Sequence, residues 1–210
     1  SEVKMMKVLI KNGRVIDPAS KLDKVSDLLI EDGKIAEIKT ALSAKADQII
    51  DAKGCFVMPG FIDLHVHFRD PGLEYKETLE TGGRAAVKGG VTTVCAMPNT
   101  RPVIDTAKKV AEVHERQKRE SLTNVIQLGA VTEGQKGETL SDIRGMAAEG
   151  CHAVSEDGKS VMNASLYRQG MKLAKECGIS VFAHCEDITM VEGGVMNADE
   201  NAERLGLPGI

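Results

Sequence analysis

The sequence predicts an α/β protein in which a small β domain precedes a parallel sheet flanked by helices. Three observations support this class. Residues 1–57 contain β-branched runs interrupted by pairs of a polar residue and glycine. Over residues 58–210, apolar runs alternate with helical patterns. Polar residues follow those apolar runs. With 210 residues, 42% of them hydrophobic, the chain is long enough to bury a core.

The first domain is predicted from three short β-branched runs. They are separated by Asn-Gly, Asp-Gly and Lys-Gly pairs, the residues that favour tight turns between antiparallel strands. The runs are KVLIKNGRVID (7–17), SDLLIEDGKIAEIK (26–39) and QIIDAKGCFVM (48–58). Antiparallel hairpins are therefore expected throughout residues 1–57.

Beyond residue 58 the pattern predicts five strands joined by helices, which favours βα units and a parallel sheet. The strands are FIDLHV (61–66), VTTVCAM (91–97), NVIQLGAV (124–131), HAVS (152–155) and ISVFAH (179–184). The helices are expected over residues 76–89, 106–120, 140–149 and 164–177. Residues 193–210 are expected to become helical only by packing on further elements.

Composition narrows the class of partner. The net charge of −4 comes without a block of like charges, which argues against nucleic acid and against a membrane surface, and favours a small-molecule partner. Five cysteines without C-x-x-C spacing indicate reduced thiols, and no apolar run approaches the roughly 20 residues of a membrane span. A cytoplasmic protein is expected.

The polar residues at the carboxyl ends of the predicted strands are the candidate site, because α/β folds collect their chemistry there. They are His65 and His67, Asn99, the pair Glu156 and Asp157, and His184. Residues two apart on a strand point to the same side, so His65 and His67 can chelate one metal ion. Imidazoles and carboxylates suit Zn²⁺, which with an open coordination position activates water for attack on a carbonyl.

Alternatively, the two histidines could bind no metal, since imidazoles often serve only as hydrogen-bonding groups. Asp157 and His184 at equivalent strand ends favour the metal. The other two histidines are not expected to be ligands. His114 lies in the charged segment VHERQKRE and is expected to be solvated, while His152 begins a strand and belongs at the opposite end of the sheet.

Four segments together resemble the dihydroorotase family of the amidohydrolase superfamily. They are HVHFRDPG (65–72), MPNT (97–100), SEDG (155–158) and AHCED (183–187), in this order after a small β domain. The resemblance covers the whole chain, and the R-D-P-G after H-x-H separates it from related cyclic amidases. It implies a TIM-type metallo-hydrolase barrel with two zinc ions that interconverts dihydroorotate and N-carbamoyl-aspartate in pyrimidine synthesis.

The resemblance also implies roles for individual residues. His65 and His67 match ligands of the more buried zinc, Asp157 the carboxylate that bridges both metals, and His184 a ligand of the second zinc. Arg69 and Asn99, with His67, match the substrate-binding groups. A guanidinium can bind the carboxylate of the substrate bidentately, and an amide can add an orienting hydrogen bond.

Several alternatives stay open at this point. Arg69 and Asp70 could pair with each other or cap a loop, and Asn99 could belong to an Asx-turn. Strand alternation lets only one of Glu156 and Asp157 face the site, and the motif favours Asp157. Cys185 adjoins a predicted ligand, but strand alternation points its side chain away from the site. Cys185 is therefore expected to be a small buried hydrophobic residue.

The chain departs from the family in length. A closed barrel has eight strands and about 250 residues, whereas five strands fit between residue 58 and Ile210. The family's remaining zinc histidine and the aspartate that shuttles the proton lie on later strands. The catalytic acid is therefore unknown in this sequence and is expected beyond Ile210. An open sheet is expected to expose an apolar face and an unpaired edge. A fragment of a complete enzyme is preferred over a truncated inactive product.

Other functions are retained as alternatives. One is another cyclic amidase of the allantoinase or hydantoinase type, which should not need Arg69. Another is a non-catalytic scaffold, although such chains typically have damaged H-x-H motifs. The resemblance leaves open a homodimer or an association with aspartate transcarbamoylase.

Overall fold

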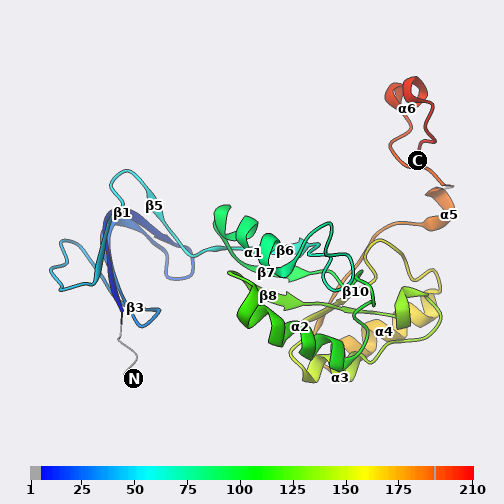
Figure 1. Cartoon of the computed structure of the whole chain (residues 1–210), viewed down its shortest axis with the longest axis horizontal. Helices are drawn as coiled ribbons and strands as arrows, with labels where there is room; N and C mark the ends of the chain where they lie inside the picture. The colour runs from blue at the N-terminus through cyan, green and yellow to red at the C-terminus, as the bar shows by residue number, and fades with distance from the viewer. Residues whose placement is uncertain (1–5, 192) are drawn as a thin grey trace. The chain divides into compact units, whose positions relative to one another are not determined.

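The computed structural model describes residues 6–191 and 193–210, and the chain divides into two compact units between Gly60 and Phe61 (Figure 1). The change of sequence pattern near residue 58 lies close to this division. The first unit is a β-sheet, and the second carries the strand–helix alternation.

The first unit begins with two antiparallel hairpins, as predicted. Strands β1 (Lys7–Asp17), β2 (Leu22–Glu31) and β3 (Lys34–Lys39) pair in sequence order. The turn between β2 and β3 has positive φ at both Asp32 (52°) and Gly33 (73°). Positive φ at two central residues matches the twist of antiparallel strands, so this Asp-Gly pair reverses the chain.

The antiparallel expectation is wrong for the end of this unit. Strands β4 (Gln48–Asp51) and β5 (Phe56–Val57) both run parallel to β1. The Lys53-Gly54 turn between them is closed by a 2.9 Å hydrogen bond from the Cys55 amide to the Ala52 carbonyl. The chain turns at Lys53-Gly54 but then continues in the same direction along the same edge of β1. These two residues therefore separate β4 from β5 without reversing the chain.

The Asn-Gly pair also does not form the expected turn, because it lies inside β1. The pairing register with β2 shifts between Ile10 and Gly13, and Asn12 has a φ of 63°. The Asn12 amide leaves the ladder and donates to Asp27 Oδ1 at 2.9 Å. These features describe a β-bulge, and asparagine is one of the residues that tolerate the positive φ found at this one.

The second unit confirms the predicted alternation and its parallel sense. Strands β6 (Phe61–Val66), β7 (Val91–Ala96) and β8 (Asn124–Gln127) form one three-stranded sheet, and β9 (Gly129–Ala130), β10 (Ala153–Ser155) and β11 (Ser180–Phe182) form another. All described pairs in both sheets are parallel. The run predicted as one strand over 124–131 divides at Leu128, since β8 pairs with β7 and β9 with β10.

Four helices follow the strands: α1 (Leu79–Lys88), α2 (Ala107–Glu120), α3 (Ile143–Ala148) and α4 (Ala164–Glu176) (Figure 1). α1 and α3 begin later than predicted, because side chains of Thr78 and Asp142 accept hydrogen bonds from the first-turn amides of Thr81 and Gly145. Such caps satisfy amides that have no helical partner and fix where a helix starts.

The core of this unit lies between its strands and helices, and its centre is fully buried. Side chains from β7, β8 and β10 pack against those of α2 and α3; they include Val94, Val125, Val154, Val110 and Ile143. In the described residues β6 pairs only with β7, and β11 only with β10. Phe61, Ile62 and Leu64 of β6 are 57% to 63% exposed, as expected for an open sheet with an apolar face.

The last segment holds two short helices. α5 (Ile188–Val191) and α6 (Glu200–Leu205) are separate, and α6 is closed locally by the Asp199 side chain and by Gly206 at a φ of 65°. The expectation that residues 193–210 order only by packing on other elements is therefore wrong for α6. None of the helices in the described residues has the length and apolar character needed to cross a bilayer.

Candidate metal centre

The predicted site residues come together at the carboxyl ends of the parallel strands. His65 lies near the end of β6 and His67 directly after it, while Asp157 and His184 each follow their strands, β10 and β11, by two residues. Adjacent parallel strands end at the same edge of a sheet, so polar residues from distant parts of the sequence meet there.

His65 and His67 direct their Nε2 atoms toward each other and toward one carboxylate. The two Nε2 atoms are 3.2 Å apart. His65 Nε2 lies 3.3 Å from Asp157 Oδ1, and His67 Nε2 lies 3.4 Å from Asp157 Oδ2. The three side chains place one ligand atom each within 4.8 Å of one another, as a metal site requires.

His184 approaches the same carboxylate from another strand. Its Nδ1 atom lies 3.5 Å from Asp157 Oδ1, the oxygen that also faces His65. Asp157 thus has one histidine at Oδ2 and two at Oδ1. Both carboxylate oxygens of Asp157 therefore face imidazole nitrogens.

The ambiguity between the two acids has a clear geometric answer. Glu156 is only 3% exposed and turns away from the histidines. Its Oε2 accepts from the amides of Val131 and Thr132 at 3.0 and 3.1 Å, and its Oε1 from the Thr132 hydroxyl. Burial raises the pKa of Glu156. Glu156 therefore ties the end of β10 to the end of β9, and Asp157 is the acid that faces the histidines.

Asn99 lies between two of the candidate ligands. Its Nδ2 donates to Asp157 Oδ2 at 3.0 Å, and its Oδ1 faces His67 Nδ1 at 3.0 Å. A carboxylate only accepts, so the amide nitrogen must face Asp157 and the amide oxygen must face His67. His67 Nδ1 consequently carries the proton and donates to Asn99.

The proton on Nδ1 leaves His67 Nε2 with a free lone pair in the site. The pKa of His67 is lowered, chiefly by burial, which also favours the neutral imidazole. Two imidazole nitrogens 3.2 Å apart beside a carboxylate are the donor set that a divalent cation fits. Sequence reasoning expected Asn99 at the substrate and did not foresee its place between two ligands.

Arg69 is half-buried and has the geometry of a strained residue. Its φ is 60°, a conformation in which a residue other than glycine needs support from its surroundings. Across residues 6–191 and 193–210, its guanidinium makes no hydrogen bond or ion pair. Its charge is close enough to contribute to the lowered pKa of His67.

Asp70 does not pair with Arg69, contrary to one alternative reading of the motif. It is 2% exposed and binds Arg116 of α2 through two hydrogen bonds, of 2.6 Å to Oδ1 and 2.9 Å to Oδ2. It also accepts from the Leu79 amide at 3.3 Å, at the start of α1. Asp70 therefore fixes the loop, while Arg69 stays available for a ligand.

Cys185 is exposed, so the expectation of a small buried hydrophobe is wrong. β11 ends at Phe182, three residues earlier. Strand alternation does not extend to position 185, and it carries no information on where that side chain points.

Ile210, the residue beyond which the catalytic acid is expected, contributes no chemistry to this centre. Its side chain is apolar and 52% exposed. Its backbone amide donates to the Met196 carbonyl at 2.7 Å, and its carbonyl accepts from the Ala198 amide at 3.2 Å. Ile210 therefore pairs through its backbone with the segment that precedes α6. The position of the proton-shuttling aspartate beyond Ile210 stays a prediction.

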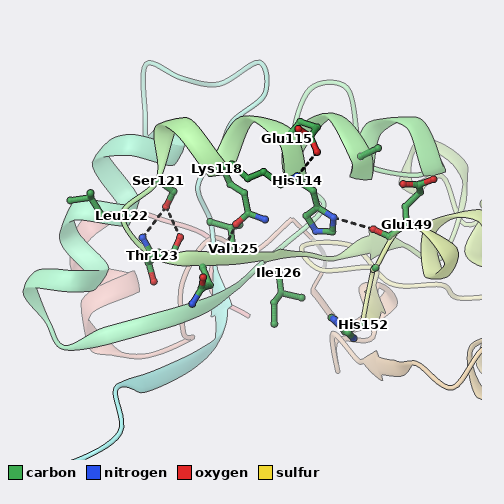
Figure 2. A pocket seen from close by; sticks show the side chains of 14 residues that line it. His114, Glu115, Lys118, Ser121, Leu122, Thr123, Val125, Ile126, Glu149 and His152 are labelled. Atoms are coloured by element: carbon green, nitrogen blue, oxygen red, sulfur yellow. Dashed lines mark hydrogen bonds and ion pairs between the residues drawn. The ribbon is translucent and has the colours of Figure 1, made fainter. Parts of the chain in front are cut away.

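A cavity of about 700 Å³ lies away from these residues, at the amino ends of β8 and β10 (Figure 2). His114, His152 and Lys118 line it. The expectation that His114 is solvated is wrong, because both of its ring nitrogens have protein partners. Its Nδ1–H donates to the Glu149 carbonyl at 3.0 Å, and its Nε2 accepts weakly from the Gln127 amide at 3.5 Å. His114 therefore joins α2 to two neighbouring segments.

His114 should make folding sensitive to acid. Burial is the main cause that lowers its pKa. The unfolded chain then binds a proton near the ordinary histidine pKa of about 6.5 while the folded chain resists it, so stability falls as the pH drops through that window. We expect His114→Gln, which keeps a donor and an acceptor, to lose less stability than the unmodified chain between about pH 7.5 and 5.5 in urea unfolding.

The exposed His152 beside the same cavity gives the control. Because His152 adds only a lesser, coulombic cause to the lowered pKa of His114, His152→Gln should alter the loss of stability on acidification less than His114→Gln does. An equal acid response in both variants and the unmodified chain would contradict the assignment to His114.

Comparison with known proteins gives a consistent set of relatives. The family model described as dihydro-orotase-like matches residues 54–210. The dihydroorotase of Geotalea daltonii is 48% identical over 206 residues, covering 98% of this chain and 48% of that protein. The dihydroorotase of Solibacter usitatus is 46% identical over 205 residues, with the same two coverages. The chain spans about half the length of the curated relatives it matches.

Solved structures show the same fold. L-hydantoinase (dihydropyrimidinase) from Arthrobacter aurescens aligns with a TM-score of 0.78 and 26% identity, over 90% of this chain and 42% of that one. D-hydantoinase (dihydropyrimidinase) from a Thermus species aligns with a TM-score of 0.66 and 31% identity, over 88% and 41%. The α/β character predicted from the sequence is confirmed by these alignments.

Proposed function

The chain belongs to the dihydro-orotase-like family, and from this premise we propose that it forms the metal-binding part of a dihydroorotase. The reaction is the reversible hydrolysis of the cyclic amide of dihydroorotate to N-carbamoyl-aspartate, a step of pyrimidine synthesis. The observation that carries the proposal is the approach of His65, His67 and His184 to the one carboxylate of Asp157.

The donor set fits zinc. Imidazole nitrogens with a carboxylate are common Zn²⁺ ligands, although related divalent ions bind the same groups. His65, His67 and Asp157 would hold one ion, and Asp157 with His184 would contribute to the site of a second. Bound zinc supplies a Lewis acid that polarises an amide carbonyl and activates water near neutral pH.

Arg69 would bind the substrate. Dihydroorotate carries a carboxylate, and the guanidinium of Arg69 has no partner among the described residues. A bidentate pair would hold the ring in one orientation, with its amide toward the histidines. The positive φ of Arg69 is consistent with a residue held in place for binding.

Substrate binding by Asn99 and His67 also stays a proposal. The amide of Asn99 already bonds His67 and Asp157, so its contribution to substrate binding should be smaller than that of Arg69. No side chain in residues 6–191 or 193–210 is assigned as the acid that protonates the leaving nitrogen. We propose that a residue outside this sequence, after Ile210, supplies that acid.

We further propose that β6, β7, the divided run of β8 and β9, β10 and β11 are five consecutive strands of a TIM-type barrel. Their parallel pairing in sequence order supports this, as do the alignments with hydantoinases. The free edges of β6 and β11 would then pair with additional strands. A cytoplasmic location, a homodimer and an association with aspartate transcarbamoylase remain predictions.

A hydantoinase-type cyclic amidase is the second candidate, because the aligned solved structures are hydantoinases. Arg69→Ala separates the two. We expect the zinc-loaded chain to lose affinity for dihydroorotate roughly 10- to 100-fold, as charge-assisted hydrogen bonds contribute about 1.5–3 kcal/mol. Calorimetric titration with dihydroorotate, and with a cyclic amide that lacks the carboxylate, measures the effect.

Zinc content should stay unchanged in this variant. Arg84→Ala is the matched control, since Arg84 lies on the exposed surface of α1 and pairs with Glu80. Equal affinity of Arg69→Ala and the unmodified chain for dihydroorotate would argue for the hydantoinase type.

A further inference from the structure

His184 is held between two carboxylates, and its two ring nitrogens face different ones. Nδ1 lies 3.5 Å from Asp157 Oδ1, and Nε2 lies 3.2 Å from Glu186 Oε2. A neutral imidazole carries a single proton, so only one nitrogen can donate while the other presents a lone pair. Which nitrogen carries the proton decides whether His184 can bind a cation beside Asp157.

We propose that Glu186 is a positioning residue that accepts the Nε2 proton of His184 and thereby presents Nδ1 to the metal centre. The inference rests on the proposed metal-binding function. The Nε2–Glu186 distance is the shorter of the two, which favours the proton on Nε2. A lone pair on Nδ1 would then face a carboxylate oxygen, an arrangement that becomes favourable when a cation lies between them.

The backbone around Glu186 supports a fixed geometry. The hydroxyl of Ser160, from the loop after β10, donates to the Glu186 carbonyl at 2.6 Å, and its oxygen also lies 3.3 Å from the His184 carbonyl oxygen. One side chain therefore anchors the main chain on both sides of Cys185. The loop after β10, which also supplies Asp157, thus contacts the backbone of His184 and Glu186 through Ser160. The distance between the His184 and Glu186 side chains therefore does not depend on the loop after β11 alone.

His67 and His184 differ in the group that accepts the proton of the ring nitrogen facing away from the proposed metal. His67 is fixed in the same way but by a neutral partner, the amide oxygen of Asn99, and it presents Nε2. His184 has a charged partner and presents Nδ1. A carboxylate acceptor makes an imidazole a more basic ligand than an amide acceptor does. Glu186 should therefore matter most for the ion bound between Asp157 and His184.

The test uses the 210-residue chain and its variants Glu186→Ala and Glu186→Gln. ¹⁵N NMR of the histidine rings at alkaline pH, without metal, reads which nitrogen of His184 carries the proton. We expect Nε2–H in the unmodified chain and in Glu186→Gln, whose amide oxygen still accepts, and a shift toward Nδ1–H in Glu186→Ala. Nδ1–H in the unmodified chain, or an unchanged tautomer in Glu186→Ala, would overturn the inference.

Zinc titration gives the second readout. Glu186→Ala should lower the affinity for the second equivalent of zinc roughly 10- to 100-fold, as loss of a ligand's hydrogen-bond partner typically does. The first equivalent should change little, and Glu186→Gln should lose less. Asp187→Ala is the matched control, because it removes the same charge from the same loop but contacts Thr189 and not His184.

His184→Ala separates this inference from the proposed function. If it leaves the second equivalent of zinc unchanged, the metal role of His184 fails, and the positioning role fails with it. If it removes that equivalent while Glu186→Ala alters neither tautomer nor affinity, only the role of Glu186 fails.

Discussion

Replacing Asp157 with asparagine is expected to weaken zinc binding at both proposed positions by at least about 100-fold. A four-ligand zinc site binds with about 10–16 kcal/mol, an average of roughly 3 kcal/mol per ligand, and each 1.4 kcal/mol is about a factor of ten. Asp157 is the residue that all three histidines approach, so no other single change removes as much. Competitive zinc titration against a chelator measures both affinities.

The neighbouring acid gives a matched control. Glu156→Gln removes a carboxylate one residue away, but that carboxylate binds Val131 and Thr132 and not the histidines. Zinc affinity should stay within a few-fold, while the free energy of unfolding falls by about 1–3 kcal/mol, because buried donors lose an acceptor. Equal zinc affinities in Asp157→Asn and Glu156→Gln would contradict the assignment of Asp157 as ligand.

The candidate metal ligands were predictable because each depends on a local pattern. His65 and His67 are two apart at a strand end, and Asp157 and His184 follow apolar runs that form parallel strands. Once a parallel sheet is inferred, topology alone brings such residues to one edge. The structure places all four together, and their binding of metal stays a prediction.

The hydrogen-bond partners of these ligands were beyond sequence reasoning. Asn99 and Glu186 lie in loops, and the atoms they contact depend on loop conformations that no periodicity encodes. A weak signal existed for Glu186, since a carboxylate two residues after a candidate ligand is a common partner for its second nitrogen. Cys185 shows the opposite error, where strand alternation was extended beyond the strand.

The first unit shows a similar limit for turn residues. Asn12-Gly13, Asp32-Gly33 and Lys53-Gly54 each place a polar residue before glycine, yet only the second reverses the chain between adjacent antiparallel strands. Each pair permits positive φ, and whether the result is a hairpin, a bulge or an interruption depends on which strands are available to pair.

Replacing Arg116 with leucine is expected to destabilise the second unit by about 3 kcal/mol. Asp70 has a side chain only 1% exposed, and Arg116 is its charged partner. Removing one member of a buried pair leaves an uncompensated charge, which typically costs about 3–5 kcal/mol, and the lower end applies because Arg116 is 34% exposed. Hydrogen bonds to Glu120 and Asp70 raise the pKa of Arg116, so it stays charged throughout.

A double-mutant cycle with Asp70→Asn tests the pair by urea unfolding. Asp70→Asn can still accept from Leu79, so its own cost should be smaller, and Asp70→Asn with Arg116→Leu should cost less than the sum of the single changes. Arg119→Leu, on the exposed surface of α2, is the control and should change stability by no more than about 0.5 kcal/mol. Additive costs in the cycle would show that Asp70 and Arg116 do not stabilise each other.

The coupling between Asp70 and Arg116 also bears on the site, because Asp70 follows Arg69 directly in the chain. The ion pair that stabilises the unit also holds the loop that carries the proposed substrate-binding guanidinium. Dihydroorotate affinity should therefore fall in Arg116→Leu even where zinc affinity does not, since the proposed zinc ligands lie outside this ion pair.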